Sequence, residues 1–88
     1  EPTPRLWSLL GDLHFMRKDY AESYEAYRQS AAMDTTSGRP LLMMGYCAIQ
    51  LEKNEDAISA LERAVEYPDE RGKANQLLLA LKQLTGEQ

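Results

Sequence analysis

The sequence has little of what catalytic, metal-binding and disulfide-linked proteins need. Its 88 residues include one cysteine and one histidine. A single cysteine excludes an internal disulfide and every metal site built from several cysteines. The five glycines are scattered along the chain, so no glycine-rich loop is present that could hold a phosphate. The sequence therefore predicts a protein that is not an enzyme and that carries no metal and no cofactor.

Basic residues and long apolar runs are scarce as well. Ten Lys and Arg residues stand against fourteen Asp and Glu residues, which gives a formal net charge of -4. A nucleic-acid-binding face needs a surplus of basic side chains to neutralise phosphates, so no nucleic-acid partner is expected. No apolar run approaches the roughly 18 to 20 residues of a membrane span. We therefore expect no direct insertion into a membrane.

Neither end of the sequence has the features of a natural terminus. The chain begins Glu-Pro-Thr-Pro without a methionine and lacks the basic and apolar blocks of a signal peptide. We expect it to be a segment of a longer protein. The sequence then indicates no compartment, since cytoplasm and periplasm are both compatible with one unpaired cysteine.

The sequence does have a strong helical pattern. Hydrophobic residues make up 43% and charged residues 27%, as in folded proteins. The prolines fall at the beginning or between periodic segments, where a helical chain tolerates them, and apolar residues recur at helical spacing. This pattern predicts an all-α chain with five helices. The first three are expected over about 4–17, from residue 19, and around 41–51. The fourth is expected from a cap at Asn54 to Pro68-Asp69, and the fifth from there to Gly86.

The first two helices also have recognisable ends and faces. Thr3 is expected to cap the first helix, with Pro4 in its first turn. Asp19 and Glu22 stand three residues apart, as in a capping box at the start of the second. The first helix carries one apolar stripe, formed by Leu6, Leu9, Leu10 and Leu13.

An internal repeat with a period of roughly 34 residues appears when the chain is shifted along itself. Gly11 then falls on Gly45, and Tyr27 falls on Leu61. Small residues repeatedly fall on small residues, which predicts points where two helices approach closely. Two helices in every period predict a repeated antiparallel helix pair.

These residues resemble the signature of the tetratricopeptide repeat family. Trp7, Leu10 and Gly11 match the opening of that signature, and Tyr27 matches its large aromatic residue, whereas Leu41 replaces the tryptophan in the second copy. The resemblance implies an all-α, right-handed superhelical stack of antiparallel helix pairs. Its expected units are a first repeat over 4–37, a second repeat over 38–69, and a capping helix or half repeat over 70–86.

The resemblance also implies a function, because in this family the first helix of each pair lines a concave groove that binds proteins. We therefore expect a protein–protein interaction module that scaffolds a complex by binding a protein or peptide ligand. Such a ligand would be apolar or mixed, with Arg5 and Arg39 meeting an acidic group. The implied groove residues are Arg5, Ser8, Asp12, Phe15 and Met16 from the first repeat, and Arg39, Leu42, Tyr46, Ile49 and Gln50 from the second. The apolar members could instead pack between neighbouring helices.

The best-known ligand of the family, a carboxylate at a chaperone's C-terminus, is not expected here. That clamp uses Lys, Asn and Arg side chains as convergent donors. At the corresponding positions this chain has Ser8, Asp12, Met43, Lys73 and Leu77, of which only Lys73 fits.

Two further interpretations concern single residues and the chain as a whole. His14 and Cys47 fit structural roles, as a hydrogen-bonded histidine and a small core residue, better than catalytic ones. The competing function is that of a structural spacer or self-association element of a larger protein, which leaves a homodimer open.

Overall fold

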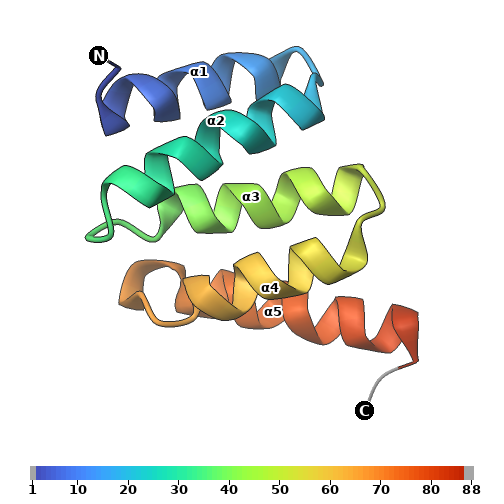
Figure 1. Ribbon diagram of the computed structural model, residues 1–88. Helices are drawn as coiled ribbons and strands as arrows, with labels where there is room; N and C mark the ends of the chain where they lie inside the picture. Colours follow the sequence, from blue (N-terminus) through green and yellow to red (C-terminus); the bar gives the residue numbers. More distant parts are fainter. Residues whose placement is uncertain (1, 87–88) are drawn as a thin grey trace.

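The computed structural model describes residues 2–86, and all regular secondary structure in that range is helical. Its five helices are α1 (Pro4–Met16), α2 (Tyr20–Met33), α3 (Arg39–Gln50), α4 (Asn54–Ala64) and α5 (Pro68–Thr85) (Figure 1). The all-α prediction is confirmed. None of these helices combines the length and the apolar character needed to cross a membrane, as far as the described residues go.

Two of the predicted helix ends are found in the structure. The Thr3 side chain accepts a hydrogen bond from the Leu6 amide at 3.1 Å and so caps α1. Gly86 ends α5 in the left-handed conformation, with φ 79°, which glycine adopts without a steric penalty.

Two other predicted helix ends are wrong in detail. The Asp19 side chain makes no capping hydrogen bond to α2. Its Oδ2 instead lies 3.8 Å from Nδ1 of His14. Asn54 is the first helical residue of α4 rather than its cap, and Lys53 holds the cap position.

The turns inside the two helix pairs repeat the same backbone conformation. Lys18 follows α1 with φ 64°, and Glu52, one repeat period later, follows α3 with φ 58°. In both turns the amide of the next residue donates to the carbonyl five residues earlier, at 2.9 Å. The repeat seen in the sequence is therefore also present in the backbone.

Glycine at Lys18 or at Glu52 is expected to raise the free energy of unfolding by about 0.5–1 kcal/mol. The left-handed conformation costs an ordinary residue about 1–2 kcal/mol, and the extra unfolded-state freedom of glycine offsets part of that gain. Urea denaturation of each variant measures the change. Arg17→Gly is the control, because Arg17 has φ -86°, and this variant should have a lower free energy of unfolding. A similar decrease for Lys18→Gly would contradict the prediction.

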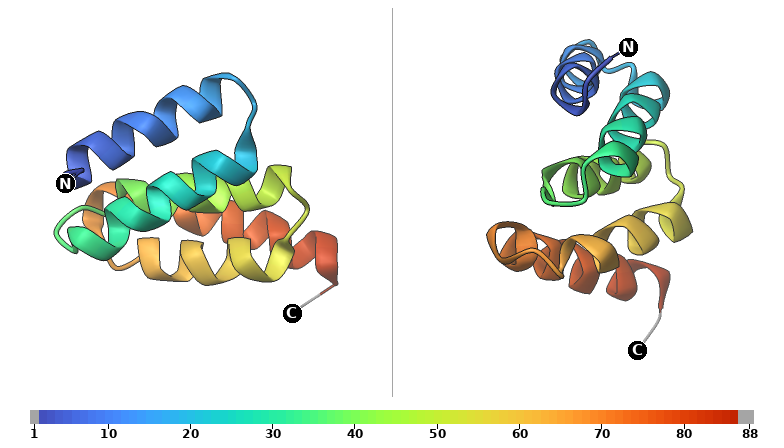
Figure 2. Two further views of the ribbon diagram at one scale, coloured as in Figure 1. Left: turned by 45° about the horizontal axis from the view of Figure 1, so that its top comes forward. Right: turned by 60° about the vertical axis from the view of Figure 1, so that its left-hand side comes forward.

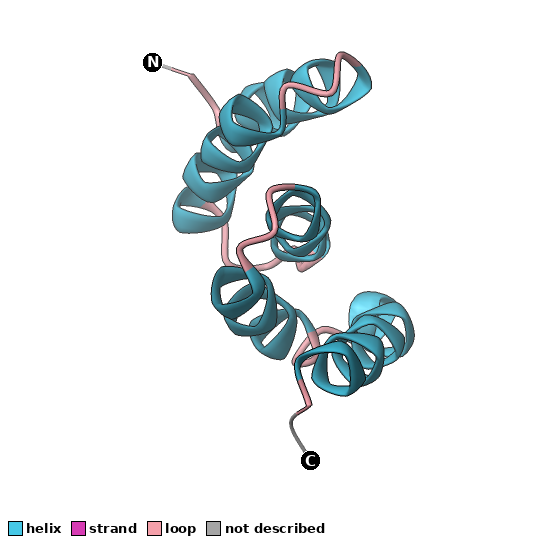
Figure 3. Cartoon of the chain, turned by 90° about the vertical axis from the view of Figure 1, so that its right-hand side faces the viewer, coloured by secondary structure: helices cyan, strands magenta, loops and turns pink. Residues whose placement is uncertain are grey.

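The helices pack in sequence order. Each one lies against the next, and α3 also touches α5. The right-hand view of Figure 2 places α1, α3 and the start of α5 on one side and α2 on the other. Figure 3 shows that the stack follows a curved path. As a result, α1 and α3, the first helices of the two pairs, line the same side.

The core contains the close approaches that the repeat predicts. Tyr27 and Leu61 are fully buried. A Cβ atom added to Gly11 would lie 2.7 Å from the Tyr27 ring, and one added to Gly45 would lie 2.5 Å from Leu61. In both pairs the second helix therefore places its large side chain directly against a glycine of the first.

The apolar stripe of α1 does not form part of this core. Leu6, Leu9 and Leu13 are 44%, 53% and 51% exposed, because no helix of residues 2–86 covers that face. The position equivalent to Leu13 is Cys47 of α3, which is fully buried and in contact with Ser23 of α2. In α3, the same face is therefore covered by the preceding helix.

Candidate functional site

Two hollows open between α1 and α3, and Arg39 lines both of them. The first, called the polar hollow below, has a volume of about 240 Å³ and is lined by Pro4, Arg5, Ser8, Ser30, Asp34, Ser37, Arg39 and Pro40. The second, the apolar hollow, has a volume of about 290 Å³ and is lined by Asp12, Phe15, Met16, Tyr27, Arg39 and Met43. They lie on the side of the stack where the first helices of the two pairs face one another.

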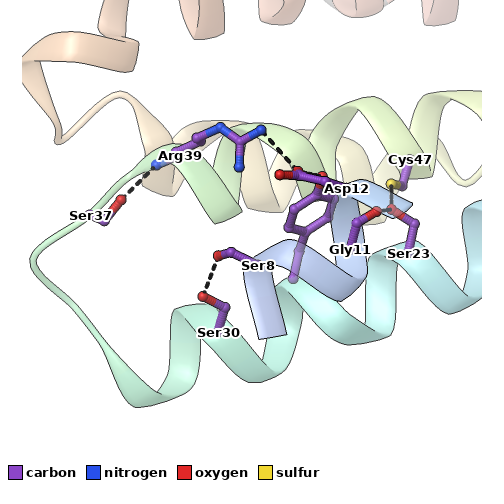
Figure 4. Close-up of polar contacts among 9 residues, drawn as sticks. Ser8, Gly11, Asp12, Ser23, Ser30, Ser37, Arg39 and Cys47 are labelled. Atoms are coloured by element: carbon purple, nitrogen blue, oxygen red, sulfur yellow. Dashed lines mark hydrogen bonds and ion pairs between the residues drawn. The ribbon is translucent and has the colours of Figure 1, made fainter. Parts of the chain in front are cut away.

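The floor of the polar hollow is held by serine side chains. Ser30 donates to the carbonyl of Pro4 at 2.9 Å, and the hydroxyls of Ser8 and Ser30 lie 2.7 Å apart. Ser8 must therefore donate to Ser30, whose own proton is already used. On the opposite wall, Ser37 accepts from the Arg39 amide at 3.4 Å (Figure 4). The Ser37 hydroxyl proton has no acceptor among residues 2–86.

Arg39 is fixed at the junction of the two hollows by contacts with α1 and α2. Its Nη2 donates to Oδ1 of Asp12 at 2.9 Å (Figure 4), and the Tyr27 hydroxyl donates to the same oxygen. The guanidinium also stands 6.0 Å from the centre of the Tyr27 ring, within cation–π range. Burial and the Asp12 carboxylate raise the pKa of Tyr27, so its phenol stays a hydrogen-bond donor.

The charges that line the polar hollow differ in how far they are already paired. Arg5 is exposed and has no hydrogen-bond or ion-pair partner within the described part of the chain. Asp34 accepts from both the amide and the hydroxyl of Thr36, at 2.9 and 2.6 Å, and these bonds lower its pKa. Two guanidinium groups and one carboxylate line this hollow, and Arg39 is also paired with Asp12, so Arg5 is the cation without an acidic partner in the described residues.

The walls of the apolar hollow differ in rigidity. Phe15 packs edge-on against Tyr20, with ring centres 5.5 Å apart, and also lies against the core. Met16 is 78% exposed, and Met43 is half-buried. A fixed aromatic ring thus faces two flexible thioether side chains, which adapt to the shape of an apolar group.

Six of the ten predicted groove residues line these hollows, and the other four do not. Leu42 and Ile49 are half-buried against the core, which is the packing that the sequence left as an alternative. Tyr46 is half-buried, and Gln50 is exposed. The six are Arg5, Ser8, Asp12, Phe15, Met16 and Arg39.

The sequence missed the groups that fix these residues. Tyr27 was expected only as the large aromatic residue of the repeat signature, yet its hydroxyl reaches Asp12. A buried tyrosine usually needs a hydrogen-bond partner, and that rule is the signal that could have linked the two. The other lining residues outside the predicted groove set are Pro4, Ser30, Asp34, Ser37, Pro40 and Met43.

The two residues with catalytic potential differ in how far the structure explains them. Cys47 is fully buried and donates to the Ser23 hydroxyl at 3.3 Å, and burial raises its pKa, so it is a core thiol as predicted. His14 is half-buried, but its Nδ1 has no hydrogen-bond partner in the described residues, so the prediction of a hydrogen-bonded histidine is wrong there. Within residues 2–86, no three His, Cys, Asp or Glu side chains gather as metal ligands.

The two helix pairs are similar to a known protein family. The model of a family described as anaphase-promoting complex, cyclosome, subunit 3 matches residues 4–64, which run from the start of α1 to the end of α4. The match therefore includes both helix pairs and every residue that lines the two hollows. The search of curated proteins found no match to the chain.

Proposed function

The chain belongs to the anaphase-promoting complex subunit 3 family, whose helical repeats are of the tetratricopeptide type, and we propose that it recruits a partner protein through the hollows between α1 and α3. Repeats of this type generally act as protein-interaction modules. In this proposal the chain scaffolds a complex by holding one segment of its partner. In this proposal residues 4–37 and 38–69 are the two repeats, and residues 70–86, which include most of α5 (Pro68–Thr85), cap them.

The fixed position of Arg39 is the observation that carries this proposal. Its guanidinium is held by Asp12 before any ligand arrives, and it separates a polar hollow from an apolar one. A group that is already ordered loses less conformational entropy on binding. Met16 beside it leaves apolar surface exposed to solvent, and such surface is typical of binding sites.

Peptides selected from a random displayed library on the whole chain test this proposal. Selected peptides are expected to bind the chain with about tenfold higher affinity than they bind the double variant Arg5→Gln, Met16→Ser. Both side chains are exposed, so their replacement should leave the fold intact. Fluorescence anisotropy measures the affinity, and circular dichroism checks the fold.

A matched control separates the groove from general surface effects. Lys73→Gln with Leu79→Ser also removes one exposed cation and one exposed apolar side chain, but on α5. It should bind the selected peptides as the parent chain does. If the groove variant keeps full affinity for every selected peptide, recruitment through the α1–α3 hollows is wrong.

The exposed stripe of α1 favours self-association as the second candidate function. Leu6, Leu9 and Leu13 are all exposed, and their spacing of three and four residues is that of a coiled-coil seam. Two copies could cover these leucines by pairing through α1. The chain would then serve as a spacer or dimerisation element of a larger protein.

Leu9→Glu is expected to convert such a dimer into a monomer, because each copy would bring a carboxylate into an apolar contact. Sedimentation velocity across a range of protein concentrations measures the change. Leu79→Glu, which changes an exposed leucine of α5, should leave the dimer unchanged. A parent chain that stays monomeric at the highest concentration excludes this alternative.

A further inference from the structure

The polar hollow is lined by hydrogen-bond donors that are not all used. Arg5 is unpaired in the described residues, and the Ser37 hydroxyl proton is also unused. One nitrogen of Arg39 donates to Asp12, and the other nitrogens of the guanidinium remain as donors. Guanidinium groups bind carboxylates through two parallel hydrogen bonds. The hollow is therefore equipped for an oxygen anion.

Arg5 is the cation of the hollow that has no acidic partner in the described residues. Arg39 is already paired with Asp12, and Asp34, which its bonds to Thr36 keep ionised, lines the same hollow as Arg5. A phosphate group carries nearly two negative charges and would also face Asp34 and Asp12. The first turns of α1 and α3, which border the hollow, contain no acidic residue that would already neutralise their positive ends. One carboxylate fits this environment better than a phosphate does.

The neighbouring apolar hollow takes a group of different chemistry. Phe15, Met16 and Met43 form its walls. Its volume of about 290 Å³ is enough for one large apolar side chain, such as leucine, methionine or phenylalanine. Each hollow thus accommodates a single side chain.

The distance between the hollows sets the spacing of the two groups. On α1 the polar hollow is lined by residues 4, 5 and 8, and the apolar hollow by residues 12, 15 and 16. The two groups of lining residues are centred about nine positions apart, which corresponds to about 13 Å along a helix. An extended peptide covers that distance in about four residues.

We propose that the ligand is an extended peptide segment with an Asp or Glu side chain in the polar hollow and a large apolar side chain about four residues away in the apolar hollow. This inference rests on the function proposed above and adds the chemistry that the ligand must have. Arg5 and Arg39 bind the carboxylate, Ser37 donates to it, and the two methionines enclose the apolar group.

The probes are amidated and acetylated Gly-Ser peptides of about nine residues that carry Glu and Leu four residues apart, in either order. Amide NMR spectra of the whole labelled chain are recorded during titration. One order is expected to bind about tenfold more tightly than the same peptide with Gln in place of Glu, and to shift the signals of Arg5, Ser37 and Arg39. Replacing Leu with Gly should weaken binding as well.

Variants of the chain assign the effect to the polar hollow. Arg5→Gln should reduce the difference between the Glu and Gln peptides, whereas Lys73→Gln on α5 should leave it unchanged. Two more peptides test the source of the anion, one with phosphoserine in place of Glu and one with a free C-terminal carboxylate at the same distance from Leu. Tighter binding of either would overturn the assignment to a side-chain carboxylate.

Other outcomes separate this inference from the function on which it rests. Equal binding of the Glu and Gln peptides, or no binding in either order, refutes the inferred ligand chemistry. If library-selected peptides still lose affinity for the Arg5→Gln, Met16→Ser variant, recruitment through the hollows is supported although the inferred ligand chemistry is wrong. If the selected peptides bind that variant as tightly as they bind the parent chain, both proposals fail.

Discussion

Replacing Gly11 with alanine is expected to lower the free energy of unfolding by about 2 kcal/mol, although alanine is the better helix former. The added Cβ would lie 2.7 Å from ring atoms of Tyr27. That ring is fully buried, and its hydroxyl is bonded to Asp12, so it cannot move without breaking the contact that fixes Arg39. Overpacking of this kind costs up to about 3 kcal/mol, and the helix propensity of alanine returns about 1 kcal/mol.

Gly72→Ala is the matched control for this prediction. Gly72 lies within α5, and an added Cβ there would meet no atom within 4 Å. The Gly72→Ala substitution should raise the free energy of unfolding by up to about 1 kcal/mol, because only the helix propensity changes. Urea denaturation of both variants measures the difference. If Gly11→Ala is as stable as Gly72→Ala, the close packing of Tyr27 on α1 is wrong.

The contrast between these glycines shows why so much of the fold could be predicted from the sequence. Gly11 and Gly45 recur at the repeat distance, each opposite a large residue that recurs as well. Gly72 has no such partner. Periodicity within a helix identifies its buried face, and periodicity between helices shows which faces meet. Both signals were present, and the order of the five helices followed from them.

The exposed stripe of α1 shows where this reasoning ends. Leu6, Leu9 and Leu13 have the spacing of a buried helix face, but they are exposed in residues 2–86. A pattern identifies an apolar face without identifying the element that covers it. The capping box failed for a related reason, because the spacing of Asp19 and Glu22 does not fix the direction of a side chain.

The candidate site could be predicted in part, for the same physical reasons. The resemblance to the tetratricopeptide repeat family implied that Ser8 and Asp12 lie in the groove, and both line the hollows between α1 and α3. It could not show that Tyr27 of α2 and Arg39 of α3 meet at one oxygen of Asp12, because that contact joins three helices. Whether a site residue is available to a ligand depends on such contacts, which a periodic pattern does not contain.

Replacing Leu61 with alanine is expected to lower the free energy of unfolding by about 3–4 kcal/mol, the largest of the expected losses. The side chain is fully buried and fits against Gly45 of α3. Its loss removes apolar contacts and leaves a cavity that the packed helices can only partly close. Small domains have about 5–15 kcal/mol of stability in total. The variant should therefore unfold at low urea concentration, and the signal of the folded state has to be measured there. If the variant is partly unfolded in buffer, a stabilising osmolyte is added to the measurement.

Gly45→Ala is expected to change the sign of its effect in the Leu61→Ala background. In the parent chain the new Cβ would lie 2.5 Å from Leu61 and cost about 2 kcal/mol, as at Gly11. Without the leucine the same methyl group enters the cavity, and helix propensity alone makes the substitution favourable by about 1 kcal/mol. The double-mutant cycle should therefore give a coupling of about 3 kcal/mol between the two positions. Additive effects would mean that Gly45 and Leu61 are not in contact, and that the repeat does not place α4 on α3 as it places α2 on α1.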